Sequence, residues 1–214
     1  MDNELIIQFQ VFLLDWFEKN KRIFPWRYTY NPYLVLVSEL LLQQTNVSKI
    51  IHPYNNIISK YQNIEDLSNA DPKHLRELFK EIGLFYRADR LINISLEIVH
   101  KFNGIIPNQW DELINIKGIG SYICSAILCF GYKQPYAVVD TNVIRIMERI
   151  FDFKSECSRP RTDKKLWEFA QIIAVEDSCV DYNYAILDFA ALICTAYKPK
   201  CNICVFKNIC CYIK

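Results

Sequence analysis

The sequence predicts an all-α fold. Apolar residues recur at helical spacing along nearly all of the 214 residues, and alternating strand patterns are nearly absent. Residues 136–139 form the one short β-like run, which is too short to change the fold class. Apolar residues make up 51% of the chain, enough to build a sizeable packed core.

The expected helices follow one another along the chain. The first covers residues 4–19, and the second begins after Asn31-Pro32 and reaches about Asn46. Asparagine followed by proline is a typical helix start, because the proline needs no N–H partner there. Further helices are expected at residues 47–60, 64–70, 72–81, 87–102, 111–116, 121–131, 140–150, 163–175 and 182–192.

Composition excludes several classes of protein. The formal net charge of +1 gives no global attraction to nucleic acid, so a DNA-binding surface must be a local basic patch. No run of about 18 apolar residues is present, so no membrane span is expected. The first ten residues, MDNELIIQFQ, lack a basic region followed by an apolar stretch, so we expect no secretion signal.

The stretch from Ile114 to Arg145 contains a glycine turn, Gly118-Ile119-Gly120, between two apolar-periodic segments. Glycine accepts the conformations of a tight turn and lets another backbone approach closely. Ser121 is expected to cap the helix that follows. A tight turn that leads into a helix presents several unpaired N–H groups, which favour an anion such as a DNA phosphate.

Asp140 follows Gly120 by twenty residues and heads another helical run. One interpretation is that Asp140 caps its own helix. The other is a catalytic carboxylate that faces DNA. Asn142 can orient that carboxylate or serve as a second cap.

Nine cysteines without a secretion signal favour metal binding or buried thiols over disulfides. The C-terminal region carries the pattern Cys194-x6-Cys201-x2-Cys204-x5-Cys210. A C-x2-C pair alone fits zinc. One tight pair flanked by two wider spacings also fits a 4Fe–4S cluster, and the spacing leaves both open. We interpret Cys211 as a spare residue.

The glycine turn, the aspartate about twenty residues on and the four-cysteine pattern, in this order, resemble the helix-hairpin-helix DNA glycosylases of the endonuclease III and MutY superfamily. The resemblance covers residues 24–210. It implies two helical lobes with a DNA cleft between them. The implied ranges are residues 27–134, with the helix-hairpin-helix at about 111–131, for one lobe, and residues 1–26 plus 135–214, with a cluster loop at 194–210, for the other.

The resemblance assigns roles to residues already singled out. It implies that Asp140 is the catalytic carboxylate and that Gly118 and Gly120 grip a DNA phosphate. It implies a 4Fe–4S cluster on Cys194, Cys201, Cys204 and Cys210. It also implies a cytoplasmic, nucleoid-associated protein of prokaryotic type that acts as a monomer on mismatched double-stranded DNA.

Tyr122 separates this sequence from the strand-cleaving members of the superfamily. Bifunctional endonuclease III-type enzymes carry a lysine nucleophile two residues past the second hairpin glycine, where this chain has Tyr122. Without that amine no Schiff base forms, so we expect a monofunctional glycosylase without strong AP lyase activity. Tyr122 is then expected to line the mouth of the base pocket.

Two segments are similar to the mismatch-specific branch, which contains MutY-type adenine glycosylases and archaeal-type thymine glycosylases. They are Phe24-Pro25-Trp26-Arg27 and Ser38-Glu39-x3-Gln43-Gln44-Thr45. Trp26 and Arg27 can wall the base pocket, although Trp26 equally suits an ordinary core. Glu39 is the candidate acid that protonates the leaving base, and the alternative is a core-edge glutamate that caps a neighbouring helix.

Gln43 or Gln44 resembles the element that fills the gap left by a flipped base or reads its former partner. A solvated helix end is the alternative interpretation. Flipping costs a few kcal/mol, least for a mismatched pair.

Different sequence features point to different excised bases. Glu39 and the Gln-Gln-Thr run favour adenine, whose departure benefits from protonation. A closer resemblance to the thymine branch is found at Tyr184, in residues 179–183 and in residues 80–84. MutY-type enzymes also usually continue into a further domain after the cluster. We therefore predict thymine or uracil opposite guanine, with adenine opposite guanine or 8-oxoguanine as the alternative. A non-catalytic DNA-binding module is a second alternative, which has no need of Glu39 and Asp140.

Overall fold

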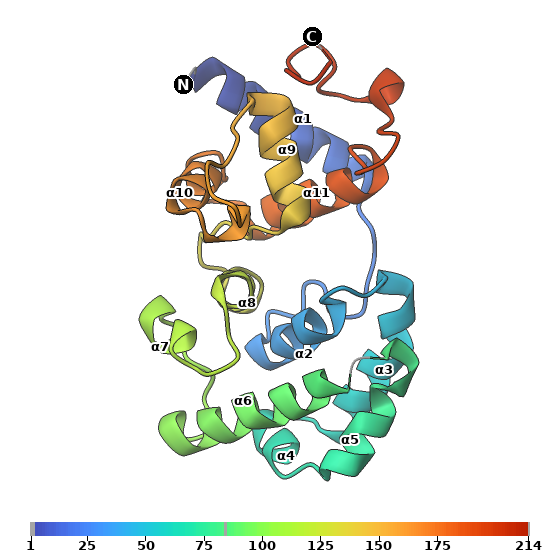
Figure 1. The fold of residues 1–214 in the computed structure, drawn as a ribbon, viewed down its shortest axis with the longest axis vertical. Coiled ribbons are helices and arrows are strands. Elements are labelled where there is room, and N and C mark those ends of the chain that lie inside the picture. Colours follow the sequence, from blue (N-terminus) through green and yellow to red (C-terminus); the bar gives the residue numbers. More distant parts are fainter. Residues whose placement is uncertain (1–2, 84, 214) are drawn as a thin grey trace. The chain divides into compact units, whose positions relative to one another are not determined.

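The computed structural model describes residues 3–83 and 85–213, and it shows helices joined by turns and loops with no β-strand in these ranges (Figure 1). The all-α prediction is confirmed. The chain divides into two compact units: residues 1–22 with 134–214, called the terminal unit, and residues 23–133, called the central unit. The ranges expected from the sequence placed the first boundary four residues later and the second one residue later.

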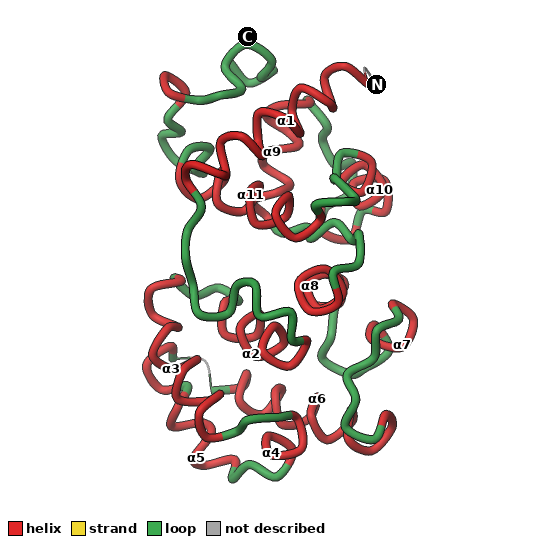
Figure 2. Tube along the Cα trace, turned by 180° about the vertical axis from the view of Figure 1, so that it is seen from behind, coloured by secondary structure: helices red, strands yellow, loops and turns green. Residues whose placement is uncertain are grey.

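The central unit is built around α2 (Pro32–Leu42), which contacts α3, α6 and α8. Asn31 caps α2, because its side chain accepts hydrogen bonds from the N–H groups of Tyr33 (2.9 Å) and Leu34 (3.4 Å). The tube in Figure 2 shows the course of the other helices in this unit. They are α3 (Val47–Lys60), α4 (Ile64–Ser68), α5 (Pro72–Leu78), η1 (Lys80–Ile82), α6 (Tyr86–Phe102), α7 (Trp110–Ile114), α8 (Ser121–Ala126) and the π-turn η2 (Ile127–Gly131).

The terminal unit packs α1 (Asn3–Asn20) against α11 (Cys179–Leu192), and α11 against α9 (Thr141–Phe151). An aromatic core forms around Phe9, whose ring centroid lies 5.0 Å from that of Phe151 and 4.9 Å from that of Phe206. The unit also contains η3 (Pro160–Thr162), α10 (Lys164–Ile172) and η4 (Cys201–Ile203). The core therefore joins the first helix of the chain to the cysteine-containing loop at the other end.

Several expected helix boundaries were wrong: for example, α5 ends at Leu78 rather than at residue 81, and α11 begins at Cys179 rather than at residue 182. The helix expected to reach Asn46 ends at Leu42, and Asn46 instead caps α3, which requires extended backbone before that helix. Ser121 is not a cap. Gly120 occupies the N-cap position of α8 with φ −105° and ψ 173°, so Ser121 is already helical.

Among the described residues, none of the helices is long and apolar enough to cross a membrane.

Candidate active-site residues and cysteine pocket

Asp140 is held at the N-terminus of α9 in the terminal unit. Its Oδ1 accepts hydrogen bonds from the backbone N–H groups of Asn142 and Val143, both at 2.8 Å. Its Oδ2 accepts a hydrogen bond from the Asn142 side-chain amide at 2.6 Å. Asp140 is thus a helix cap, and Asn142 orients the carboxylate. The group is half-buried, so it combines a fixed position with access to solvent.

The segment that leads into Asp140 is held by side chains from α10 and α11. Gln171 accepts from the N–H of Ala137 (3.0 Å) and donates to the carbonyl of Pro135 (2.6 Å). Asn183 accepts from the N–H of Val138 at 2.8 Å. These side chains take the place of strand pairing and fix the backbone that presents Asp140. Gln171 was not predicted from the sequence, and Asn183 was noted only in the segment that resembles the thymine branch.

The glycine turn has two different glycines. Gly118 has φ +105°, and a Cβ there would lie 3.2 Å from Ile94 and 3.3 Å from Arg90. Gly120 has an ordinary φ, is exposed, and a Cβ there would meet no atom within 4 Å. The turn itself therefore requires Gly118. Gly120 leaves open space at the N-terminus of α8, where another molecule can approach the backbone.

Arg90 of α6 joins this turn to the end of α2, which the sequence analysis did not foresee. Its Nε donates to the carbonyl of Gly118 at 2.8 Å, and its Nη2 donates to the same oxygen. Its Nη1 donates to the Gln43 side-chain oxygen at 2.8 Å. Burial lowers the pKa of the Arg90 guanidinium from its ordinary value.

Arg87, one turn earlier on α6, is fully buried. Its Nη1 donates to the carbonyl of Leu41 (3.0 Å) and to the hydroxyl of Thr45 (2.9 Å). An Arg-x2-Arg spacing on a helix places both side chains on one face, so the shared face of these two arginines can be predicted from the sequence. Their partners, 28 to 47 residues away, were not.

The remaining candidates on α2 and α8 differ in exposure. Glu39 is only 4% exposed and lies one turn before Gln43. Gln44 is exposed and adopts a left-handed backbone with φ +54°, which is uncommon for a residue other than glycine. Tyr122 is half-buried in the first turn of α8. The central unit thus contains a buried acid, an exposed strained glutamine and a half-buried tyrosine.

Trp26 lies in the core of the central unit, which agrees with its interpretation as an ordinary core residue. It is 4% exposed, stacks on Phe24 with ring centroids 5.0 Å apart, and meets Tyr54 edge-on at 5.3 Å. Arg27 is half-buried, with its guanidinium 5.1 Å from the Phe24 ring centroid. A role for either residue in a base pocket stays a prediction.

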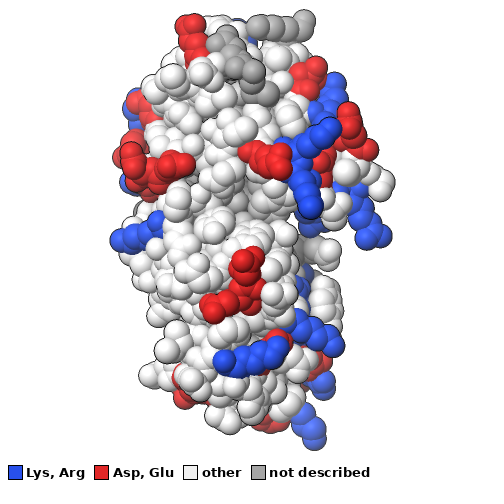
Figure 3. Space-filling view, turned by 90° about the vertical axis from the view of Figure 1, so that its left-hand side faces the viewer, with Lys and Arg blue, Asp and Glu red and all other residues white. Residues whose placement is uncertain are grey.

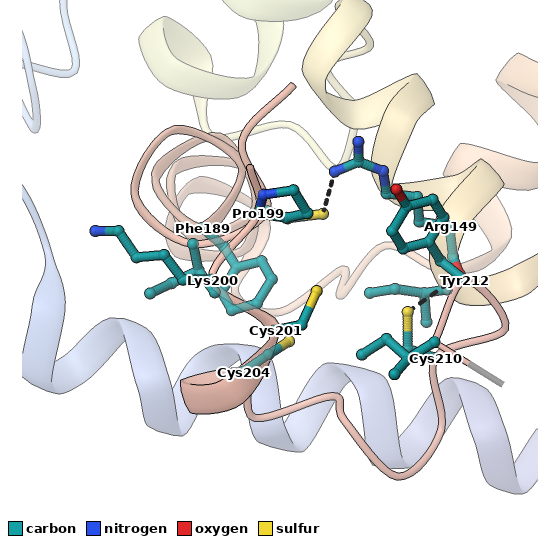
Figure 4. A pocket seen from close by; sticks show the side chains of 12 residues that line it. Arg149, Phe189, Pro199, Lys200, Cys201, Cys204, Cys210 and Tyr212 are labelled. Carbon is teal, nitrogen blue, oxygen red and sulfur yellow. Dashed lines mark hydrogen bonds between the residues drawn. The ribbon is translucent and has the colours of Figure 1, made fainter. Parts of the chain in front are cut away.

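Cys194, Cys201, Cys204 and Cys210 line one pocket in the terminal unit, with about 300 Å³ of empty space that is partly open to solvent. Figure 4 shows Cys201, Cys204 and Cys210 on its walls, with Arg149 beside them. Burial raises the pKa of Cys204 to about 11 and also raises that of Cys210. Arg149 donates to the Cys194 sulfur at 3.4 Å. Cys211 is exposed and does not line this pocket.

Both metal interpretations, zinc and a 4Fe–4S cluster, need several ligands close together. A tetrahedral zinc ion with bonds of about 2.3 Å needs sulfur atoms within about 4 Å of one another. In the described part of the chain, no three Cys, His, Asp or Glu side chains are close enough to form a metal-binding group. All four thiols line this one pocket, which suits a metal centre held by four cysteines. The donor set, four cysteines, is the one that iron–sulfur clusters use.

Surface charge gives no single-sign field on the face drawn in Figure 3, where basic and acidic side chains are interspersed with wide uncharged areas. Lys198, Lys200 and Lys207, which flank the cysteines, are all exposed. Because the formal net charge is only +1, recognition of a polyanion must rely on local groups, such as these lysines and the open backbone at Gly120.

A helical fold with a glycine hairpin, a capped aspartate and four C-terminal cysteines defines a class of DNA repair proteins, and comparison with known proteins agrees. Residues 37–171 match the family described as "HhH-GPD superfamily base excision DNA repair protein". The chain belongs to this superfamily. The predicted resemblance to helix-hairpin-helix glycosylases is thereby confirmed.

Individual proteins similar to this chain include DNA glycosylases that are named for different bases. A thymine/uracil-DNA glycosylase of Pyrobaculum aerophilum is 34% identical over 95% of this chain and 90% of its own length. An adenine DNA glycosylase of Buchnera aphidicola subsp. Baizongia pistaciae is 33% identical over 92% of this chain, but over 56% of its own length. The solved structure of a thermostable thymine-DNA glycosylase superposes with a TM-score of 0.93 at 31% identity, covering 99% of this chain and 97% of that one.

Proposed function

We propose that this protein removes a mispaired thymine or uracil opposite guanine from double-stranded DNA by hydrolysing the N-glycosidic bond. The observation that carries the proposal is the Asp140 carboxylate, which three hydrogen bonds fix at a helix N-terminus. The thymine/uracil relative and the thymine-DNA glycosylase structure support the choice of base. We retain the predictions that it acts as a monomer and on mismatched rather than matched duplex.

Asp140 supports hydrolysis through charge. Breaking the bond between sugar and base leaves positive charge on the sugar, and a preorganised carboxylate stabilises that charge without reorganising. The departing base takes a proton from an acid, water supplies a hydroxyl group to C1′ of the sugar, and the remaining proton of that water restores the acid. Asn142 holds one carboxylate oxygen.

Glu39 is proposed as the proton donor to the leaving base. A buried carboxyl group is the type of acid that can remain protonated near neutral pH. Two carboxyl groups with separate roles, one for charge and one for the proton, is the division of labour in glycoside hydrolysis. Gln44, exposed and already in a strained conformation, is proposed to fill the gap left by the flipped base.

A 4Fe–4S cluster on Cys194, Cys201, Cys204 and Cys210 is part of the proposal. When bound, the cluster would cross-link the loop after α11 through four thiolates. The loop would then present Lys198, Lys200 and Lys207 to DNA phosphates. Iron and sulfide analysis of anaerobically purified protein should give four of each per chain with broad visible absorption, whereas stoichiometric zinc without iron would contradict the cluster.

Adenine is the second candidate base. It is favoured by Glu39, by the Gln43-Gln44-Thr45 run and by the 33% identity to an adenine DNA glycosylase. Against it stands Tyr184, which is buried on α11 where adenine-type enzymes usually carry Glu or Gln. Of residues 80–84, which resemble the thymine branch, Leu84 lies outside the described residues.

A panel of duplexes tests the function. Duplexes with T·G, U·G, A·G or A·8-oxoguanine pairs, and matched controls, are incubated with the protein and then treated with alkali, which breaks the strand at any abasic site. We expect breakage at thymine and uracil opposite guanine and none in matched duplexes. Breakage only at adenine would establish the second candidate. Specific binding without breakage in any duplex would instead establish a non-catalytic module.

The absence of strand cleavage needs its own test. With Tyr122 in place of a lysine nucleophile, borohydride should trap little covalent protein–DNA complex, and the abasic strand should stay intact until alkali is added. Tyr122→Lys should create trapping, and Tyr122→Phe is the matched control. Strong trapping by the unmodified protein would show that another amine acts as nucleophile.

A further inference from the structure

Arg90 contacts two elements of the central unit that the proposed function assigns to DNA. Three donors on one planar guanidinium are used: Nε and Nη2 on the Gly118 carbonyl, and Nη1 on the Gln43 Oε1 atom. The fork of an arginine is rigid, so fixing one side also fixes the direction of the other. Arg90 therefore sets the position of the Gln43 side chain relative to the glycine turn.

The chemistry of arginine also fixes which way the Gln43 amide faces. A guanidinium has only donors, so the group it contacts must be the amide oxygen rather than the amide nitrogen. The contact of 2.8 Å uses that oxygen. What Gln43 can then offer to another molecule is its NH₂ group, with two donors. A free glutamine could rotate and present either a donor or an acceptor, but this one is held.

Gln43 sits where such a donor can be used. It is half-buried at the C-terminal end of α2 and precedes Gln44, which is exposed with φ +54°. Arg87 holds the other side of the same turn through Leu41 and Thr45. Two arginines of α6 thus hold the turn of residues 43–45 through hydrogen bonds.

We infer that Arg90 is a specificity-determining positioning residue, which holds the Gln43 amide so that it donates a hydrogen bond to an acceptor atom of the base left in the duplex opposite the flipped nucleotide. This inference rests on the proposed function. The acceptor is a carbonyl oxygen or a ring nitrogen, since these are the acceptors that base edges present. Arg90 itself touches the protein and not the base.

The test measures binding rather than catalysis. Fluorescence anisotropy gives the Kd for a duplex that carries a tetrahydrofuran abasic analogue opposite guanine or opposite an analogue that lacks one acceptor. The analogues are 2-aminopurine, without O6, 7-deazaguanine, without N7, and 3-deazaguanine, without N3. For the unmodified protein, one analogue should bind about two- to tenfold more weakly than guanine, the usual worth of one hydrogen bond.

Gln43→Glu is the decisive variant. A carboxylate keeps a partner for Arg90 and leaves the fold intact, but it presents an acceptor where the amide presented donors. It should bind the guanine duplex more weakly than Gln43→Ala does and should lose the difference between guanine and its analogue. Binding equal to the unmodified protein would overturn the inference.

Arg90→Gln tests the positioning role. It should reduce the difference between guanine and the analogue, and in the double variant with Gln43→Ala it should cause no further reduction, because Arg90 acts through Gln43. Arg76→Gln is the matched control. Arg76 lies on α5 and forms an ion pair at the surface with Asp89 of α6 (2.8 Å). A full additional reduction in the double variant would overturn the inference.

The outcome is separable from that of the proposed function. The abasic analogue needs no base release, so a discriminating protein that releases no base would contradict only the proposed activity. A protein that releases base while treating all four opposite bases alike would contradict only the role of Arg90.

Discussion

Asp140 and Gln43 are fixed in opposite ways. The Asp140 carboxylate is fixed by its own helix, through groups two and three residues away. The Gln43 amide is fixed by an arginine 47 residues later in the sequence. The first arrangement holds a negative charge with the local geometry of a helix start. The second arrangement holds a neutral group, and the direction of its hydrogen bonds depends on how α6 packs against α2.

The difference separates chemistry from recognition. A local cap keeps its geometry as long as its helix is folded, so it suits a charge that must not move during a reaction. A side chain held from another element is coupled to the glycine turn that the same arginine holds. Disturbing Asp140 should therefore change rate, whereas disturbing the Arg90 contacts should change binding preference.

The largest expected effect is that of Asp140→Asn. Asparagine caps a helix about as well as aspartate, so folding should be unaffected, but the charge is lost. The single-turnover rate of base release should fall about 10²–10³-fold, because a preorganised charge of this kind is worth about 3–4 kcal/mol. The Kd for the mismatched duplex should stay the same. A normal rate in this variant would remove the basis for the enzymatic proposal.

Gly118→Ala should have the next largest effect, on stability. The residue has φ +105°, and the new Cβ would press on Ile94 and Arg90 at 3.2 and 3.3 Å. Urea unfolding should show a loss of about 1–3 kcal/mol. Gly120→Ala is the matched control, because its φ is ordinary and its surroundings are empty. Its free energy of unfolding should change by less than about 0.5 kcal/mol.

Gly120→Ala separately tests the backbone site at α8. If a DNA phosphate approaches the exposed N–H groups there, the added methyl group should weaken binding to matched and mismatched duplexes alike. Anisotropy with both duplexes measures this. A loss confined to the mismatched duplex would contradict a phosphate contact.

The smallest expected effect is that of Asn142→Ala. It removes one hydrogen bond to Asp140 Oδ2 but leaves the two backbone bonds to Oδ1. The rate of base release should fall about two- to tenfold, the worth of one hydrogen bond. Single-turnover kinetics measure it. A loss as large as that of Asp140→Asn would mean that Asn142 contacts the substrate itself.

The features that we predicted from the sequence are those that depend on local contacts, as the cap at Asp140 does. The helices, the cap at Asp140 and the shared location of four cysteines depend on residues close together in the chain, and short-range patterns predicted them. The glycine turn was predicted too, although only Gly118 has the backbone that demands glycine.

What the sequence could not supply are long-range partners. Arg90 and Arg87 lie on a helix whose pattern predicts only that they share a face. Their contacts with Gln43, Gly118 and Thr45 depend on how α6 packs against α2. Gln171 and Asn183, which hold the backbone before Asp140, were missed for the same reason. The turn at residues 43–45 was assigned to a helix because its left-handed residue is a glutamine, not a glycine.

The most direct test of the proposed activity identifies the released base. One T·G duplex is incubated with excess protein, free bases are identified by mass spectrometry, and the strand is analysed without alkali. The proposal predicts free thymine in amounts equal to the abasic strand, with that strand unbroken, and release about 10²–10³-fold slower with Asp140→Asn. Release of no base from T·G or U·G duplexes, or of adenine alone from A·G, would contradict it.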